Sequence, residues 1–260
     1  DGTKKMSKSE IREVALVTGA ASGIGFALVE QLKERNYEVL GLDRNKQGLA
    51  ELKEKTGCEV LSGDISDQGF NESAILQVSK LYGKLDLVFL NAGVLGRKIE
   101  LQINEFTTEE LDPKHYMRVR AINFDSVVFG TLAAAPLLAS SGGGSIVATA
   151  SIAGLAAWNR DPFYTATKHA VVGWVRGIAS SLKTQNILIN AICPGGVATP
   201  LVGIDRLQSE NPNLLAPEQV AEAMIKTSLE KETGKAFTVK ADHEPVRQMY
   251  NFTEVEGFPI

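Results

Sequence analysis

Cysteine is scarce in this chain, and basic residues are not in excess. The 260 residues include two cysteines, Cys58 and Cys193, so the sequence excludes a disulfide framework. We therefore expect a reducing compartment, the cytoplasm. The chain has 27 Lys and Arg against 31 Asp and Glu, for a formal net charge of −4. This balance argues against a nucleic-acid-binding surface, which needs a basic excess.

Long apolar runs and metal-ligand patterns are also missing. No run approaches the about 20 apolar residues of a membrane span, so we expect no membrane partner. The polar start "DGTKKMSKSE" lacks the apolar region of a signal peptide. The three histidines, at positions 115, 169 and 243, show no metal-ligand spacing. We expect no catalytic metal.

What the chain does have is a regular alternation of short apolar and longer amphipathic segments. Apolar runs indicate buried parallel strands at 14–18, 38–43, 59–63, 85–90, 144–149 and 187–192, with a candidate seventh at 236–240. Between them, helices are predicted at 24–35, 46–55, 67–81, 108–139, 163–184 and 217–230. This order predicts the α/β class, a doubly wound parallel sheet in a single domain spanning 1–260.

A glycine-rich turn follows the first predicted strand. It reads "TGAASGIG" (18–25) and has Gly19, Gly23 and Gly25 at the start of a helix. Such glycines allow a tight bend, a close approach of phosphate and close packing of helix on strand. The helix N-terminus then favours a pyrophosphate. A turn that binds nothing is the alternative, whereas a P-loop is excluded because Phe26 follows Gly25.

An acidic residue ends the second predicted strand. Asp43 lies 24 residues after Gly19, close to the position of a carboxylate that accepts the ribose hydroxyls of a dinucleotide. A carboxylate there repels a 2′-phosphate, which favours NAD over NADP. Arg44 beside it could attract that phosphate, so NADP stays open.

A tyrosine and a lysine lie one helical turn apart in "FYTATKHA" (163–170). If both face a cavity, the positive charge of Lys168 should lower the pKa of Tyr164 and make its phenol a useful acid or base. If both are exposed, they form an ordinary helix surface. The pair alone leaves both interpretations open.

The ordered set of motifs resembles the short-chain dehydrogenase/reductase family. Besides the glycine turn and "YTATK", the chain has "GDISD" (63–67), "NAG" (91–93), "INFDSVVFGT", "ATASIAG" and "CPGGVATP" (193–200). A serine, Ser151, precedes Tyr164 by 13 residues, the usual family spacing. The resemblance covers roughly residues 11 to 200.

The resemblance implies a Rossmann fold and an NAD-dependent oxidoreductase that interconverts a secondary alcohol and a ketone. Tyr164 would act as acid or base, Lys168 would lower its pKa and bond the nicotinamide ribose, and Ser151 would bind the substrate oxygen. Asn123 would hold a water that links Lys168 to solvent. No G-x-S-x-G surrounds Ser151, which argues against a hydrolase.

Family positions also imply the two halves of a binding cavity. The cofactor would contact Gly19, Ser22, Gly23, Ile24, Gly25, Asp43, Asp64, Ile65, Asn91, Ala92, Gly93, Tyr164, Lys168, Pro194, Gly195, Val197 and Thr199. The substrate pocket would contain Val94, Leu95, Ser151, Leu155, Trp158, Phe163 and Leu201. Most of the pocket residues are apolar, which suits a hydrophobic or cyclic substrate.

Three segments lie outside the core of the resemblance. We expect a flexible N-terminal extension (1–10), a substrate lid (200–216) and an atypical C-terminal tail (241–260) that departs from the family pattern. The family usually forms homodimers or homotetramers, and we expect the same of this chain. A nucleotide-binding regulator without catalysis, an epimerase or dehydratase, and an NADP-dependent carbonyl reductase remain alternatives.

Overall fold

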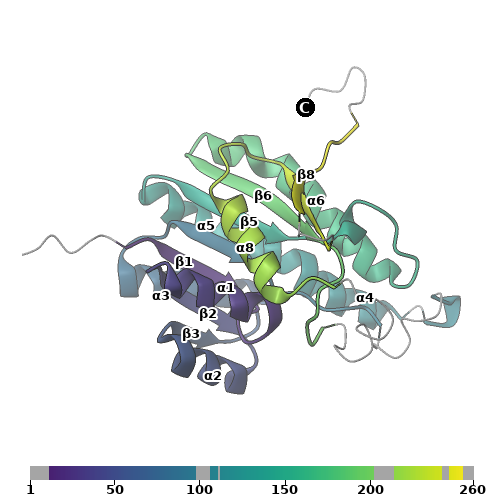
Figure 1. Ribbon diagram of the computed structural model, residues 1–260, viewed down its shortest axis with the longest axis horizontal. Coiled ribbons are helices and arrows are strands. Elements are labelled where there is room, and N and C mark those ends of the chain that lie inside the picture. The colour runs from purple at the N-terminus through teal and green to yellow at the C-terminus, as the bar shows by residue number, and fades with distance from the viewer. Residues whose placement is uncertain (1–11, 98–105, 111, 202–213, 242–245, 254–260) are drawn as a thin grey trace, which may run out of the picture.

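The computed structural model describes residues 12–97, 106–110, 112–201, 214–241 and 246–253. The predicted N-terminal extension, most of the predicted lid and parts of the tail fall outside these residues. The sheet has eight strands in the order β3-β2-β1-β4-β5-β6-β7-β8 (Figure 1). The strands are β1 Val14–Thr18, β2 Glu38–Asp43, β3 Glu59–Ser62, β4 Leu87–Leu90, β5 Gly144–Thr149, β6 Ile187–Pro194, β7 Ala236–Lys240 and β8 Val246–Met249.

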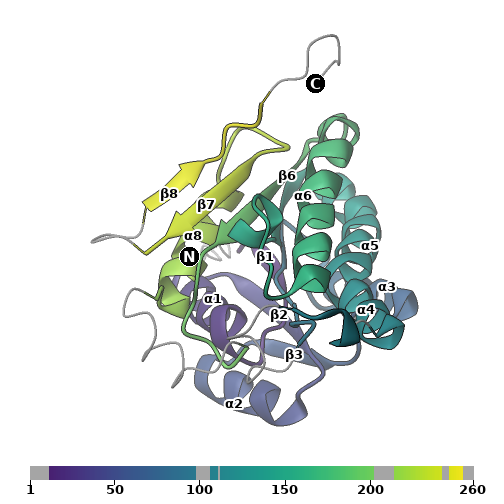
Figure 2. The same ribbon diagram turned by 90° about the vertical axis from the view of Figure 1, so that its right-hand side faces the viewer.

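Helices cover both faces of this sheet, as the buried strands require. Figure 2 shows α3, α5 and α6 on one face and α1, α2 and α8 on the other. Strands β1 to β7 pair in parallel, and every residue of β1 and of β4 is buried. The predicted doubly wound α/β class is confirmed. The helices are α1 Gly23–Glu34, α2 Lys46–Thr56, α3 Gln68–Tyr82, α4 Pro113–Arg120, α5 Ser126–Ser140, α6 Pro162–Lys183 and α8 Pro217–Ser228.

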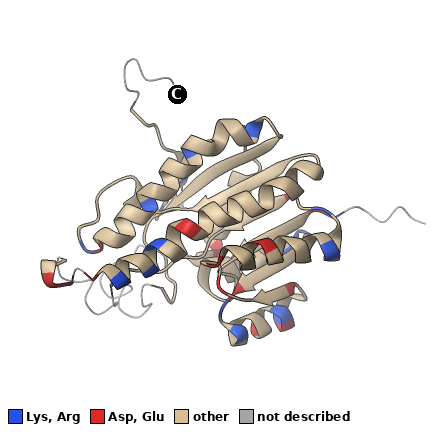
Figure 3. Ribbon diagram, turned by 180° about the vertical axis from the view of Figure 1, so that it is seen from behind, with Lys and Arg blue, Asp and Glu red and all other residues tan. Residues whose placement is uncertain are grey.

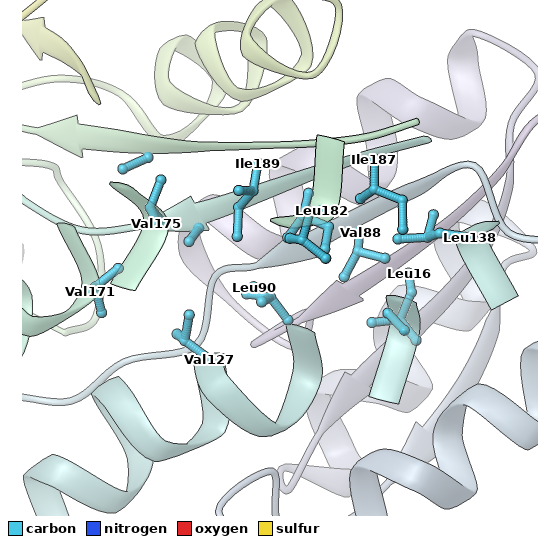
Figure 4. Packing of buried hydrophobic residues seen from close by; sticks show 14 of the residues in the cluster. Leu16, Val88, Leu90, Val127, Leu138, Val171, Val175, Leu182, Ile187 and Ile189 are labelled. Carbon is cyan, nitrogen blue, oxygen red and sulfur yellow. The ribbon is translucent and has the colours of Figure 1, made fainter. Parts of the chain in front are cut away.

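Two apolar clusters pack the two faces. In the first, Leu90 and Ile189 of the sheet contact the helical layer that contributes Val127 and Val175 (Figure 4). The second cluster lies between the sheet and α1, α2 and α8, and it includes Phe89. The sheet is thereby covered by apolar packing on both faces.

The predicted continuous helix at 108–139 was wrong. A 3₁₀ turn at Thr108–Glu110 comes first, α4 then begins at Pro113 behind the capping side chain of Asp112, and a π-helical turn occupies Ala121–Asp125 before α5. Proline has no N–H to donate and suits the first helical position, so it starts a new helix here. The π turn has no signature in the hydrophobic pattern, because it changes the hydrogen-bond register rather than the apolar face.

The sheet has an eighth strand, β8, where the sequence predicted about seven strands. β8 pairs antiparallel with β7 and forms the edge of the sheet (Figure 2). Its Arg247 lies 3.9 Å from the centroid of the Phe237 ring, donates to Thr227 Oγ1 at 2.9 Å and forms an ion pair with Glu230. The strand is therefore held by tertiary contacts that the short sequence "VRQM" does not reveal.

One helical stretch qualifies the prediction that no segment could span a membrane. Pro113–Ser140 is long and apolar enough by length and composition, with 39% of its best window buried. Its buried residues include Val127, Ala134 and Leu138, which belong to the first apolar cluster. Packing on the sheet and on α3 thus buries part of the apolar surface of α5, while Leu132 stays exposed.

Charged residues of both signs are interspersed along the helices seen from behind (Figure 3). Exposed ion pairs join neighbouring elements elsewhere, for example Arg35 of α1 with Glu222 of α8 and Lys53 of α2 with Glu59 of β3. This mixture of charges agrees with the small formal net charge of −4.

Phe89 has 0% of its surface exposed, so we expect truncation of its side chain to destabilise the fold strongly. Phe89→Ala should lower the free energy of unfolding by about 3–5 kcal/mol, because it removes buried apolar surface and leaves a cavity. Leu132→Ala is the control, since Leu132 is 55% exposed, and it should cost less than about 0.5 kcal/mol. Denaturant titration measures both, and equal effects would contradict the burial described here.

Candidate active site

A cavity of about 580 Å³ opens at the carboxyl ends of the central strands. It lies where the strand order reverses, since β1 neighbours β4 on one side and β2 on the other. Open α/β sheets bind ligands at this crevice because the loops on its two sides diverge. The loop after β1, the ends of β4 and β5, the start of α6 and the loop after β6 all contribute to the walls.

The glycine turn forms one wall of the cavity. Gly19 has φ +68°, and a Cβ there would lie 2.9 Å from the Cα of Ala92. At Gly25, a Cβ would lie 2.0 Å from the carbonyl oxygen of Gly19, so no side chain fits. The turn leads into the N-terminus of α1, and Ser22 at the N-cap makes no capping bond with its side chain. Free helix N–H groups beside a glycine cradle fit the pyrophosphate of a dinucleotide.

Acidic side chains lie at the far end of the cavity. The two carboxylate oxygens of Asp43 accept from the N–H groups of Ala21 at 3.1 Å and Asn45 at 2.9 Å, which fixes their position. Arg44 is exposed and lines the same end. Hydrogen bonds from the hydroxyl and N–H of Ser66 hold the pKa of Asp64 below its ordinary value.

A chain of hydrogen bonds crosses the carboxyl edge of the sheet. The Nζ of Lys168 donates to the Thr149 carbonyl at 2.7 Å, and Thr149 Oγ1 bonds Asn91 Oδ1 at 3.3 Å. Asn91 Nδ2 donates to the carbonyl of Thr18 at 3.3 Å, and Thr18 Oγ1 accepts from the Asn91 N–H at 2.9 Å. The network joins α6, β5, β4 and β1, and Lys168 is only 2% exposed.

Tyr164 and Ser151 meet beside this network. The Ser151 hydroxyl lies close enough to the Tyr164 phenol to lower its pKa, and the Nζ of Lys168 lies 5.5 Å from the centroid of the Tyr164 ring. Ser151 also caps the 3₁₀ turn Ile152–Gly154, where its Oγ accepts from the N–H of Ala153 at 3.1 Å. The structure thus brings together three of the four residues predicted to be catalytic.

The predicted lowering of the Tyr164 pKa was wrong for this chain. Burial raises the pKa of Tyr164 to about 12, with a further increase from the charge of Asp161 and a decrease from the Ser151 hydrogen bond. Burial also lowers the pKa of Lys168 to about 8. Sequence reasoning considered only the attraction between the two groups, whereas desolvation acts on each of them separately. At neutral pH Tyr164 therefore keeps its proton.

Asn123 lies in the π-helical turn and is fully buried. Its Oδ1 accepts from the Val94 N–H at 2.7 Å, and its Nδ2 donates to the Val94 carbonyl at 2.9 Å and to Thr167 Oγ1 at 3.2 Å. The side chain therefore holds the loop after β4 in place. The role of Asn123 in holding a relay water stays a prediction.

The substrate side of the cavity contains some of the predicted residues and excludes two. Leu155 packs against the apolar core instead. The ring of Phe163 lies 5.6 Å from that of Phe106 and 5.7 Å from that of Tyr116, because it is about 100° around the helix from Tyr164. The predicted pocket residues that line the cavity are Val94, Leu95, Ser151, Trp158 and Leu201.

The cofactor side agrees more closely with the expected positions. Gly25 does not line the cavity but lies behind the Gly19 turn. The remaining predicted contacts all line it: Gly19, Ser22, Gly23, Ile24, Asp43, Asp64, Ile65, Asn91, Ala92, Gly93, Tyr164, Lys168, Pro194, Gly195, Val197 and Thr199.

Sequence reasoning also missed several lining residues. They are Arg44, which was considered only for its charge, and Gly63, Ile122, Thr149, Ala150, Ile152, Ala153, Ala156, Ala157, Gly196 and Pro200. Most of them are sequence neighbours of a predicted site residue, so extending each motif by one or two residues would have found them.

The glycine turn yields a direct prediction. Gly25→Ala should abolish dinucleotide binding, because its Cβ would displace the carbonyl of Gly19 and open the cradle. Calorimetric titration with NAD measures the loss, with Gly173→Ala in α6 as the control because nothing lies within 4 Å of a Cβ there. Unchanged binding by Gly25→Ala would contradict the proposed cradle.

Comparisons with known proteins agree with this geometry. A family model described as short chain dehydrogenase matches residues 13–210. A 3beta-hydroxysteroid dehydrogenase 2 of Eggerthella lenta is 32% identical over 72% of this chain and 72% of its own length. Levodione reductase of Leifsonia aquatica is 31% identical over 88% of this chain and 84% of its own length.

Solved structures lead to the same family. A 3-ketoacyl-(acyl-carrier-protein) reductase from Brucella melitensis in complex with NADH has a TM-score of 0.80 and 25% identity, covering 88% of this chain and 97% of its own. An actinorhodin polyketide ketoreductase variant with NADPH has a TM-score of 0.76 and 26% identity, covering 88% and 96%. With the matched family model, the glycine cradle and the shared fold, the chain belongs to the short-chain dehydrogenase family of Rossmann-fold oxidoreductases.

Proposed function

We propose that this chain is an NAD-dependent oxidoreductase that interconverts a secondary alcohol and a ketone on a hydrophobic, cyclic substrate. The observation that carries the proposal is that Ser151, Tyr164 and the buried Lys168 line one cavity together. Family membership supports the oxidoreductase class. The substrate and the preference for NAD rest on the residues discussed below.

The three side chains divide the chemistry between them. In ketone reduction, Ser151 binds the carbonyl oxygen, and Tyr164 donates its proton to that oxygen as negative charge develops on it. Lys168 supplies a fixed positive charge that stabilises the phenolate left behind. The nicotinamide ring, when bound, would exchange the hydride with the substrate carbon and in its oxidised form would add positive charge nearby. Alcohol oxidation uses the same groups in reverse.

The preference for NAD rests on Asp43. Its carboxylate is held in place by two backbone N–H groups and lines the adenosine end of the cavity, where a 2′-phosphate would be repelled. Arg44 is exposed at the same end, and it is the one specific observation in favour of NADP. We favour NAD because Asp43 is fixed in position while Arg44 extends from the surface.

The cyclic substrate is inferred from the apolar wall beside Tyr164. Val94, Leu95 and Trp158 line this side, and the Trp158 ring meets the Tyr164 ring edge-on at 5.9 Å. Among the described lining residues, the charged ones are Asp43, Arg44, Asp64 and Lys168. None of these faces the substrate side except Lys168, and a nearby arginine, Arg97, is engaged by Glu110 through two hydrogen bonds of 2.8 Å. Relatives named for levodione, hydroxysteroids and cyclohexanol fit such a pocket.

A nucleotide-binding regulator is the second candidate, and the catalytic residues argue against it. Such a protein has no need of Ser151, Tyr164 and Lys168 together at the cavity floor.

We further propose that the chain is a single catalytic domain working in the cytoplasm as a homodimer or homotetramer. Both described cysteines are buried free thiols, and Met117 of α4 leaves exposed apolar surface for a second copy.

The function is tested by following reduced-nicotinamide absorbance with NAD and a panel of cyclic secondary alcohols. Tyr164→Phe should lower kcat by at least about 100-fold, because the proton donor is lost while the cavity keeps its shape. Leu132→Ala is the control that should leave kcat unchanged. A Tyr164→Phe enzyme as active as the parent would contradict the assignment, and NAD binding without turnover of any alcohol would favour the regulator.

The cofactor preference is tested by Asp43→Ser. Removal of the carboxylate should raise the ratio of kcat/KM for NADP to that for NAD by at least about tenfold, since a 2′-phosphate then meets no negative charge. Arg44→Ala should move the same ratio in the opposite direction. Parent activity with NADP alone would show that Arg44, rather than Asp43, governs the choice.

A further inference from the structure

Asp161 is a fully buried carboxylate that the proposed mechanism does not use. It has 0% of its surface exposed and lies at the N-cap of α6, three residues before Tyr164. Its Oδ1 accepts from the N–H of Tyr164 at 3.0 Å, and its Oδ2 accepts from the N–H of Gly96 at 2.7 Å. The N–H of Arg97 is a further donor to it. Burial raises the pKa of Asp161, whereas these three N–H donors act against burial and favour its charged, acceptor-only form.

These bonds connect the helix of Tyr164 to the loop after β4. That loop includes Val94 and Leu95, which line the substrate side of the cavity. The fit is close, because a Cβ at Gly96 would lie 2.5 Å from Asp161 Oδ1. Asp161 does not line the cavity, but it joins Tyr164 to the loop that forms one of its walls.

Other contacts fasten the same loop, and one of them reaches Tyr164 indirectly: Asn123 donates to Thr167 Oγ1, which donates in turn to the Tyr164 carbonyl at 2.8 Å. Asn123 brackets Val94 from both sides, and Arg118 donates to the Leu95 carbonyl at 3.2 Å. Arg97 donates to the carbonyl of Arg160 at 2.7 Å. Of these described contacts, the carboxylate of Asp161 alone binds both the loop and the first turn of α6.

We propose that Asp161 is a positioning residue that orients Tyr164 and couples it to the loop Val94–Arg97. The proposal rests on the function proposed above, in which Tyr164 is the acid or base. A helix cap of this kind fixes the first turn of α6, and that turn carries the phenol. A small displacement of a reacting group is enough to reduce turnover strongly.

The negative charge of Asp161 has a second, measurable consequence. The titratable groups packed around Tyr164 are Asp161 and Lys168 from α6 and Cys193 from β6. Burial raises the pKa of Cys193 to about 12, so at neutral pH this thiol carries no charge. Asp161 is then the negative group that raises the Tyr164 pKa. Neutralising Asp161 lowers that pKa, and the rising limb of alcohol oxidation against pH moves to lower pH.

The test uses Asp161→Asn in the full chain, with Asp112→Asn as the matched control. Asp112 also caps a helix, α4, by accepting from the Lys114 N–H at 2.9 Å, but it does not line the cavity. We expect Asp161→Asn to lower kcat about tenfold to hundredfold, and to move the pH profile of oxidation to lower pH. Asp112→Asn should change neither.

Hydrogen exchange provides a readout that does not depend on turnover. In Asp161→Asn, amides of the segments 94–97 and 162–166 should both exchange about fivefold faster or more, whereas Asp112→Asn affects only the start of α4. Asp161→Ser, which keeps a capping side chain too short to bind both segments, should release 94–97 more than 162–166. If the parent enzyme lacks turnover, the proposed function fails, and the exchange data alone decide whether Asp161 couples the two segments.

Two results would overturn the proposal. The first is a lower kcat with no movement of the pH profile, which would make Asp161 an ordinary structural cap. The second is faster exchange in 162–166 with unchanged exchange in 94–97, which would remove the coupling between loop and helix.

Discussion

The site depends on one buried amine and the carbonyl that it binds. The hydrogen bond from Lys168 to the Thr149 carbonyl begins a chain that passes through Asn91 to Thr18 and so ties α6 to three strands of the sheet. The carboxyl ends of parallel strands meet at one edge of the sheet. A lysine from α6 that binds the end of β5 is therefore linked, through Thr149 and Asn91, to the ends of β4 and β1. The position of Tyr164 on the same helix follows from this anchoring, and so does the position of the cavity floor.

Burial gives this floor its chemical character. It removes water from Tyr164 and Lys168 together, which raises the pKa of the phenol to about 12 and lowers that of the amine to about 8. A phenol that keeps its proton at neutral pH is suited to donating it to an oxygen on which negative charge develops. Lys168 is mostly protonated below pH 8, so its charge remains available to the phenolate. In the function proposed above, Tyr164 would therefore give up its proton only as negative charge develops on a bound substrate oxygen.

The sequence predicts well the features whose cause is local. Buried strands were found from their apolar runs, and the roles of Gly19 and Gly25 from the space that a tight turn requires. The π turn around Asn123 and the strand β8 escaped detection because each is fixed by contacts far along the chain, such as Asn123 with Val94 and Arg247 with Thr227. Phe163 was misplaced because adjacency to Tyr164 in sequence is not adjacency on a helix. The direction of the Tyr164 pKa required knowledge of burial, which no spacing conveys.

The proposed function requires hydride to pass directly between substrate and nicotinamide in the cavity above Tyr164. The most direct measurement is turnover of a cyclic secondary alcohol deuterated at its carbinol carbon, with mass analysis of the reduced cofactor. We expect one deuterium in the nicotinamide for each ketone formed, because the hydride is transferred without exchange with water. Ketone formation with no deuterium in the cofactor, or with deuterium released to solvent, would contradict it.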